Sequence, residues 1–301
     1  MAARRTGRRK AWAVLIGVSV VLALVSYLAV RFIRSATPDE CTAQGTDGTT
    51  VTLDLDQASH AATIAAVAHA HGLPERAVTI ALATAIQESK LHNLTYGDRD
   101  SLGLFQQRPS QGWGSPAQIR DPVYASGKFF DALVKVPDYL GLPVTVAAQR
   151  VQHSGYPEAY ASHEAMAATL ADVLTGREGP ALNCTVSGAD PAPSDTASSA
   201  AGAVSEAGDG SGVAAAVRRE FGDAPVAGPA TGGDSVSFPI ATEQASTGWS
   251  LALWLLCHAT ALHATSVTFD GRRWSSAASD RGWTHSTPDS RQAGVLAVEL
   301  G

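Results

Sequence analysis

Glu88 is the residue whose type and position predict chemistry most directly. It follows a stretch of mostly small and apolar residues from Val78 to Ile86, which predicts a helix buried on most of its faces. A carboxyl group at the end of such a helix lies near the negative end of the helix dipole and beside apolar side chains. Both surroundings favour the protonated carboxyl, the form that a general acid for glycosidic cleavage needs. A glutamate in the last turn of a helix is more commonly a solvated surface residue, so at this point Glu88 is one of two things: a proton donor or a surface carboxylate.

A glycine-rich segment with aromatic residues follows Glu88. Residues 101–107 are expected to be extended, and Trp113 stands between two glycines. A tryptophan in that position either stacks on a sugar face or anchors the loop. Asp98 and Asp100 offer a second carboxylate, although aspartates beside glycine also form turns with their own backbone. Both interpretations stay open at this stage.

Two of these motifs resemble those of a known family of glycan-cleaving proteins. Glu88-Ser89 followed by Gly103-Leu104-Phe105-Gln106 is similar to the Glu-Ser and Gly-Leu-Met-Gln motifs of soluble lytic transglycosylases and goose-type lysozymes. The resemblance covers about residues 55–180 and extends to the lysozyme-like domains of actinobacterial membrane-anchored exported proteins. It implies a lysozyme-like fold in which Glu88 protonates the glycosidic oxygen between N-acetylmuramic acid and N-acetylglucosamine. It also implies a saccharide groove lined by Ser89, Gly103, Leu104, Phe105 and Gln106, to which Trp113 is added as a stacking platform.

The third motif of that family is altered in this chain. Transglycosylases carry Ala-Tyr-Asn-Ala-Gly, whose tyrosine supports the acid, whereas this sequence has Val-Gln-His-Ser-Gly at 151–155, followed by Tyr156 and Tyr160. Gln152 or Tyr156 is the expected replacement. The nucleophile stays open: the sugar's own 6-hydroxyl in a transglycosylase, or a hydrolase in which Asp98 or Asp100 is the second carboxylate.

The N-terminus predicts a membrane anchor. Residues 11–30 are uncharged and almost wholly apolar, and five basic residues precede them. We expect a cytoplasmic tail over 1–10 and a single transmembrane helix over 11–33, which places the rest outside the cytoplasm. A cleaved signal peptide is the alternative.

The remaining chain divides by composition. We expect a juxtamembrane linker over 34–50, a mainly α lysozyme-like domain (α+β) over 51–185, a flexible Ala/Gly/Ser/Pro-rich linker over 186–235, and a small α/β accessory domain over 236–301. Cys41 and Cys184 bracket the first domain and are expected to form a disulfide, while Cys257 is expected in the core. No metal-ligand spacing occurs, and no metal or cofactor is expected.

The sequence thus predicts a cell-membrane, single-pass enzyme that cleaves peptidoglycan with a single glutamate as acid and base. A net charge of −6 argues against nucleic acid as a main partner. Two other functions remain: a non-catalytic scaffold that binds the cell wall, and a wall-opening component of a secretion or conjugation assembly.

Overall fold

The computed structural model describes residues 18–27, 38–153, 158–187, 210–222, 230–286 and 294–301. The chain divides into two compact units, Met1–Pro38 and Asp39–Gly301. In the first unit, residues 18–27 form a helix. All the candidate site residues belong to the second unit.

The predicted membrane-spanning helix is not supported. Among the described residues, no helix is both long and apolar enough to cross a membrane. The remainder of the predicted span 11–33 and the predicted tail 1–10 lie outside the described residues.

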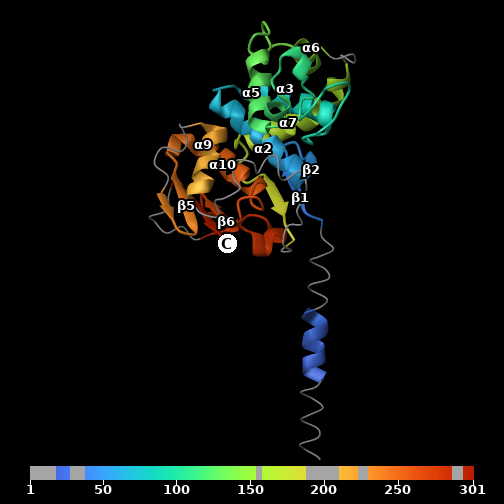
Figure 1. Ribbon diagram of the computed structural model, residues 1–301. Helices are drawn as coiled ribbons and strands as arrows, with labels where there is room; N and C mark the ends of the chain where they lie inside the picture. The colour runs from blue at the N-terminus through green and yellow to red at the C-terminus, as the bar shows by residue number, and fades with distance from the viewer. Residues whose placement is uncertain (1–17, 28–37, 154–157, 188–209, 223–229, 287–293) are drawn as a thin grey trace, which may run out of the picture. The chain divides into compact units, whose positions relative to one another are not determined.

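A small antiparallel sheet opens the second unit. Its strands are β1 (Glu40–Gln44), β2 (Thr50–Asp54) and β3 (Leu182–Thr185), in the order β2-β1-β3 (Figure 1). Cys41 lies directly opposite Cys184 across β1 and β3, and the two form a disulfide. The sheet therefore joins the two ends of the helical region.

The helical region surrounds two buried helices, α2 (Leu55–Ala70) and α3 (Glu75–Ser89). Asp54 caps α2 by accepting the backbone N–H of Gln57, whose side chain accepts the N–H of Asp54 in return. Every residue of α3 from Ala77 to Ile86 is buried, as its small apolar composition predicts. The elements that follow are η1 (Pro109–Gln111), α4 (Pro116–Ile119), α5 (Pro122–Leu133), α6 (Val144–Gln152), η2 (Ala159–His163) and α7 (Glu164–Leu174).

The C-terminal region is a six-stranded antiparallel sheet with two helices. The helices are α9 (Gly210–Phe221) and α10 (Ala245–Cys257), and short 3-10 segments lie at Thr242–Gln244 and Ser276–Arg281. The strands are β4 (Ala230–Gly232), β5 (Ser235–Pro239), β6 (Ala264–Phe269), β7 (Arg272–Ser275), β8 (Thr284–His285) and β9 (Val295–Leu300), in the order β4-β5-β9-β6-β7-β8.

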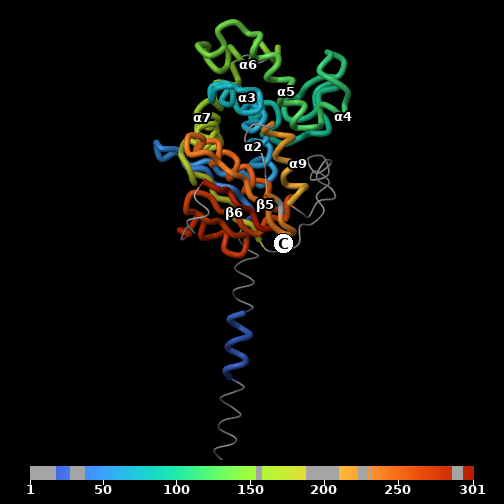
Figure 2. The backbone as a smooth tube through the Cα atoms, turned by 90° about the vertical axis from the view of Figure 1, so that its left-hand side faces the viewer, coloured from blue at the N-terminus to red at the C-terminus, as the bar shows by residue number. Residues whose placement is uncertain are grey.

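The helical and C-terminal regions share one core. Helix α10 packs against β6 and against α2, which lies between α10 and α3 (Figure 1, Figure 2). The indole N–H groups of Trp274 and Trp283 donate to the backbone carbonyls of Cys184 and Leu182 at 3.1 and 2.8 Å. These tryptophans therefore join β3 to the C-terminal region.

Three features of the second unit differ from the sequence expectation. Strand β1 (Glu40–Gln44) lies within the expected juxtamembrane linker 34–50. The described residues are 51% helical and 18% strand, a mixture of helix and sheet, so the mainly α fold class is corrected. Within the expected linker 186–235, α9 and β4 are regular elements, and α9 packs against α2. The buried face of α9 includes Val213, Val217 and Phe221.

Candidate functional site

The side chain of Glu88 is held by a buried tyrosine. Glu88 lies in the last turn of α3 and is half-buried. The hydroxyl of Tyr160, from η2, donates a hydrogen bond of 2.6 Å to Oε1 of Glu88. Because Tyr160 is fully buried, its ring cannot swing away, and the carboxyl group is fixed in one orientation.

Ser89 connects the end of α3 to the second motif. Its buried hydroxyl lies 3.0 Å from the carbonyl oxygen of Ala85 and 2.8 Å from that of Leu104, and it can donate to either. Ser89 therefore orients the turn that contains Leu104, and only 6% of its surface is exposed.

Residues 103–106 form a tight turn instead of the expected extended strand. Leu102 and Gln107 pair on its two sides, with both N–H to carbonyl distances at 3.0 Å. Gly103 has φ +74°, and a Cβ there would lie 2.6 Å from the carbonyl oxygen of Ile119. Gln106 closes the turn at φ 47° and returns its side-chain amide to the Gly103 carbonyl at 3.2 Å. The glycine is required by both conformation and space.

The two apolar residues of this turn face the core. Leu104 and Phe105 are fully buried, and the ring of Phe105 stacks on Phe129 with centroids 4.7 Å apart. Gln152, a predicted support for the acid, instead donates to the carbonyl of Phe105 at 2.7 Å. These two side chains are therefore not accessible to a saccharide. The parts of this turn that could contact one are its backbone and the side chain of Gln106.

The carboxylate of Asp100 is used for hydrogen bonds within its own loop. Its carboxylate accepts from Arg108 Nε at 2.8 Å, from the Ser110 N–H at 2.8 Å and from the Ser110 hydroxyl at 3.0 Å. The bond from Arg108, followed by those from Ser110, holds the pKa of Asp100 well below its usual range. Asp98 is almost fully exposed, 3.9 Å from Arg99. The turn interpretation is therefore favoured for Asp100.

Trp113 is half-buried and packs against the core. The hydroxyl of Tyr124, from α5, donates to its backbone carbonyl at 3.2 Å. These contacts anchor the loop after η1, while part of the indole stays exposed.

Tyr160 is the residue that the sequence interpretation missed. Tyr156, the predicted tyrosine, lies outside the described residues. The dipeptide Ala159-Tyr160 repeats the first two residues of the Ala-Tyr-Asn-Ala-Gly motif, and this was the available signal. Its bond to Glu88 spans 72 residues of sequence, so the position of Tyr160 within its own segment does not reveal its partner.

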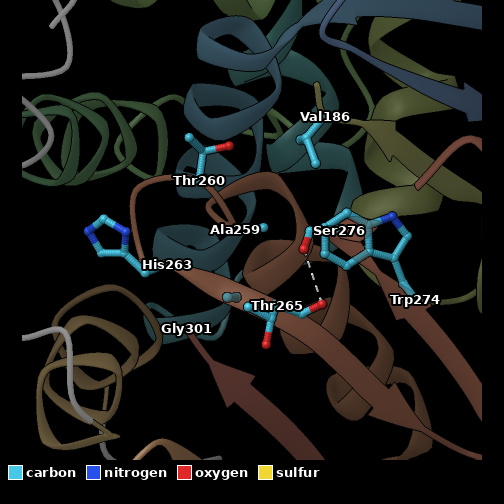
Figure 3. Close-up of a pocket in the computed structure, with 9 residues that line it drawn as sticks. Val186, Ala259, Thr260, His263, Thr265, Trp274, Ser276 and Gly301 are labelled. Carbon is cyan, nitrogen blue, oxygen red and sulfur yellow. Dashed lines mark hydrogen bonds between the residues drawn. The ribbon is translucent and has the colours of Figure 1, made fainter. Parts of the chain in front are cut away.

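A hollow of about 200 Å³ lies elsewhere, between the end of α10 and the C-terminal sheet (Figure 3). Trp274, Ser276 and Thr265 line it, and the Ser276 hydroxyl donates to the Thr265 carbonyl at 3.4 Å. Among the described residues that line it, none is an aspartate, glutamate, lysine or arginine, and none is a predicted site residue. We assign it no chemistry.

Within the described residues, the cysteines provide the one group of three or more side chains whose metal-ligating atoms lie close together. The sulfurs of Cys41, Cys184 and Cys257 lie within 4.8 Å of one another. Because Cys41 and Cys184 are joined as a disulfide, they are not available as thiolates. Burial raises the pKa of Cys257 to about 12, so this thiol is also neutral.

We expect Gly103→Ala to destabilise the protein by about 2–4 kcal/mol. The added methyl group would clash with the carbonyl oxygen of Ile119, and alanine would also be strained in the left-handed backbone conformation. Gly112→Ala is the matched control, since Gly112 has φ +81° and nothing within 4 Å of the added Cβ. Its expected cost is the strain alone, about 1 kcal/mol. Urea denaturation of both variants measures the difference, and equal midpoints would contradict the assigned role of Gly103.

The chain matches no protein-family model, and a comparison with curated proteins gives no significant match. The function of the chain must therefore be inferred from its own motifs and from the geometry around Glu88.

Proposed function

We propose that this protein cleaves the glycosidic bond between N-acetylmuramic acid and N-acetylglucosamine in peptidoglycan, with Glu88 as general acid and then base. The observation that carries the proposal is the 2.6 Å hydrogen bond from the buried Tyr160 to Glu88. An acid at the end of a buried helix, oriented by a tyrosine and adjoining a rigid turn, is what proton transfer to a glycosidic oxygen requires.

The two oxygens of Glu88 take different roles in this mechanism. Oε1 accepts from Tyr160, so Oε2 is the oxygen that carries the proton to the glycosidic oxygen. Cleavage leaves Glu88 as a carboxylate, which the Tyr160 hydroxyl stabilises by its hydrogen bond. The same carboxylate then accepts a proton from the attacking hydroxyl.

The state of the two aspartates favours the transglycosylase form of the reaction. Asp100 is an ionised carboxylate whose oxygens are taken up by Arg108 and Ser110, and Asp98 is almost fully exposed to solvent. Neither is held as a second catalytic carboxylate. We therefore propose that the sugar's own 6-hydroxyl attacks its C1 carbon and gives up its proton to Glu88, which yields a 1,6-anhydro product without water.

The disulfide supports an extracytoplasmic location, where peptidoglycan lies. Cys41 and Cys184 are bonded in the structure, and such bonds persist mainly in oxidising compartments.

Tyr160→Phe is expected to slow glycan cleavage by roughly 10- to 100-fold, because it removes the bond that orients and stabilises Glu88 but keeps the buried ring. Tyr124→Phe is the control. It also removes one tyrosine hydroxyl, and among the described contacts that hydroxyl bonds to the backbone carbonyl of Trp113 and not to Glu88. Mass spectrometry of fragments released from purified peptidoglycan gives rate and product together. Equal rates for wild type and Tyr160→Phe would contradict the role of Tyr160, and reducing ends instead of anhydro ends would replace transglycosylase by hydrolase.

A further inference from the structure

The helix that carries Glu88 ends in an unusual turn. Lys90 and Leu91 both have left-handed backbones, at φ 54° and φ 63°. One left-handed residue after a helix is common and is normally glycine. Two successive non-glycine residues in this conformation are costly, and such strain persists only where the surrounding structure enforces it.

Hydrogen bonds from the backbone fix part of this turn. The N–H of Lys90 donates to the Ile86 carbonyl at 2.9 Å, and that of Leu91 donates to the Ala85 carbonyl at 3.2 Å. The Leu91 side chain is buried. These contacts close the helix, but they leave the carbonyl groups of Lys90 and Leu91 without a helical partner.

Two side chains of α2 take up those carbonyl groups. The amide of Gln57 donates to the Lys90 carbonyl at 2.9 Å, and Nδ1 of His60 bonds to the Leu91 carbonyl at 2.7 Å. Since a carbonyl only accepts, Nδ1 of His60 must carry a proton. Gln57 and His60 are three residues apart on α2, so they lie on one face of that helix.

We infer that Gln57 and His60 are positioning residues, which clamp the strained turn at 90–91 and so keep Glu88 in place for proton transfer. The inference rests on the proposed function of Glu88. Neither residue is part of the motifs that suggested the function. Release of either carbonyl frees the turn two or three residues after Glu88, and a displacement of about 1 Å at a reacting group is enough to cost roughly 100-fold in rate.

The surroundings of His60 favour the neutral form of its imidazole ring. Burial lowers the pKa of His60, and the nearby His258 and His92 lower it further. The hydrogen bond to Leu91 and the charge of Asp56 partly oppose this shift. These groups come from α2 itself and from the segments that follow α3 and α10. Because the pKa of His60 is lower in the folded state, protonation of this histidine favours the unfolded chain. The contribution of His60 to the free energy of unfolding is therefore fully present at a pH above the ordinary histidine pKa. It is lost as the pH falls from that pKa toward the lowered pKa of the folded state.

Gln57→Glu is the sharpest test, because it separates the two roles of Gln57. The carboxylate still accepts the Asp54 N–H that caps α2, but it no longer donates to Lys90. Gln118→Glu is the matched control: Gln118 holds the same position in the capping box of α4, where its side chain accepts from Ser115. His60→Ala removes the second donor, and His60→Asn keeps an N–H close to Nδ1 but does not titrate.

Hydrogen exchange of the Lys90 and Leu91 amides in the full-length chain tests the clamp without reference to activity. We expect exchange to be about fivefold faster or more in Gln57→Glu and His60→Ala, and unchanged in Gln118→Glu. His60→Asn should keep the protection and lose part of the acid-induced fall in stability. Wild-type exchange rates in Gln57→Glu would overturn the clamp, whether or not His60→Ala folds.

Kinetics on peptidoglycan fragments tests positioning. We expect kcat to fall roughly tenfold in Gln57→Glu with KM unchanged, and to recover in His60→Asn relative to His60→Ala. Faster exchange with an unchanged kcat would overturn the positioning role. If the wild type releases no fragments, the proposed function fails, while the exchange data still decide whether the clamp exists.

Discussion

Glu88→Gln is expected to lower the rate of glycan cleavage by a factor of about 1,000 or more, with little change in affinity for the glycan. The amide keeps the size of the side chain and can still accept from Tyr160 through its oxygen, but it cannot donate a proton to the glycosidic oxygen or take one back. General acid–base groups contribute about 100- to 10,000-fold, and here one group would serve in both steps.

The affinity and the rate are measured separately in this experiment. Initial rates on a soluble peptidoglycan oligosaccharide give kcat, and calorimetric titration of the Glu88→Gln variant gives binding. Glu164→Gln is the control, because it removes a carboxylate that pairs with Arg76 at 2.9 Å and bears no bond to Glu88. A Glu88→Gln variant with wild-type kcat would exclude the proposed chemistry. Retained binding with no cleavage in the wild type would favour the wall-binding scaffold.

Loss of the disulfide has the largest expected effect on stability. Cys41 and Cys184 are 143 residues apart in sequence, so their bond restricts nearly the whole helical region in the unfolded chain. Loop entropy alone predicts a loss of about 4–5 kcal/mol in the free energy of unfolding when both become serine. The bond joins β1 to β3, and β3 in turn accepts the indole bonds of Trp274 and Trp283.

Cys257→Ala is the background for this measurement, because the sulfur of Cys257 lies within 4.8 Å of both disulfide sulfurs. Urea denaturation of Cys257→Ala, with and without the two serine substitutions, gives the contribution of the bond free of thiol exchange. The expected result is a large drop in the midpoint. Equal midpoints would show that the bond does not restrict the unfolded chain as assumed.

The sequence predicted the parts of the site that depend on local pattern. A stretch of small residues from Ala77 to Ile86 defines the buried helix, and Glu88 lies in its last turn. In the C-terminal region the apolar run Leu251 to Leu256 lies within α10, where every residue from Gly248 to Cys257 is buried.

The features of the site that the sequence did not predict depend on hydrogen bonds between residues far apart in the chain. Residues 101–107 have the apolar character of a strand, but Ser89 and Gln152 fix the Leu104 and Phe105 carbonyls and impose a turn. These bonds join residues 15 and 47 positions apart, so no local pattern encodes them. Tyr160 was missed for the same reason.

The division into two separate domains was suggested by composition alone. Ala- and Gly-rich sequence between 186 and 235 is typical of a linker, yet α9 within it buries Phe221 against Trp254 of α10, with ring centroids 6.0 Å apart.

The most direct test of the central claim is the release of soluble fragments from purified peptidoglycan by the full-length chain and by Glu88→Gln, followed by mass spectrometry. Circular dichroism and urea denaturation first establish that both are equally folded. The proposed function predicts muropeptides with 1,6-anhydro ends from the wild type and none above background from Glu88→Gln. Equal release by the two proteins, or none by either, would contradict the assignment of Glu88 as the acid that cleaves the glycan.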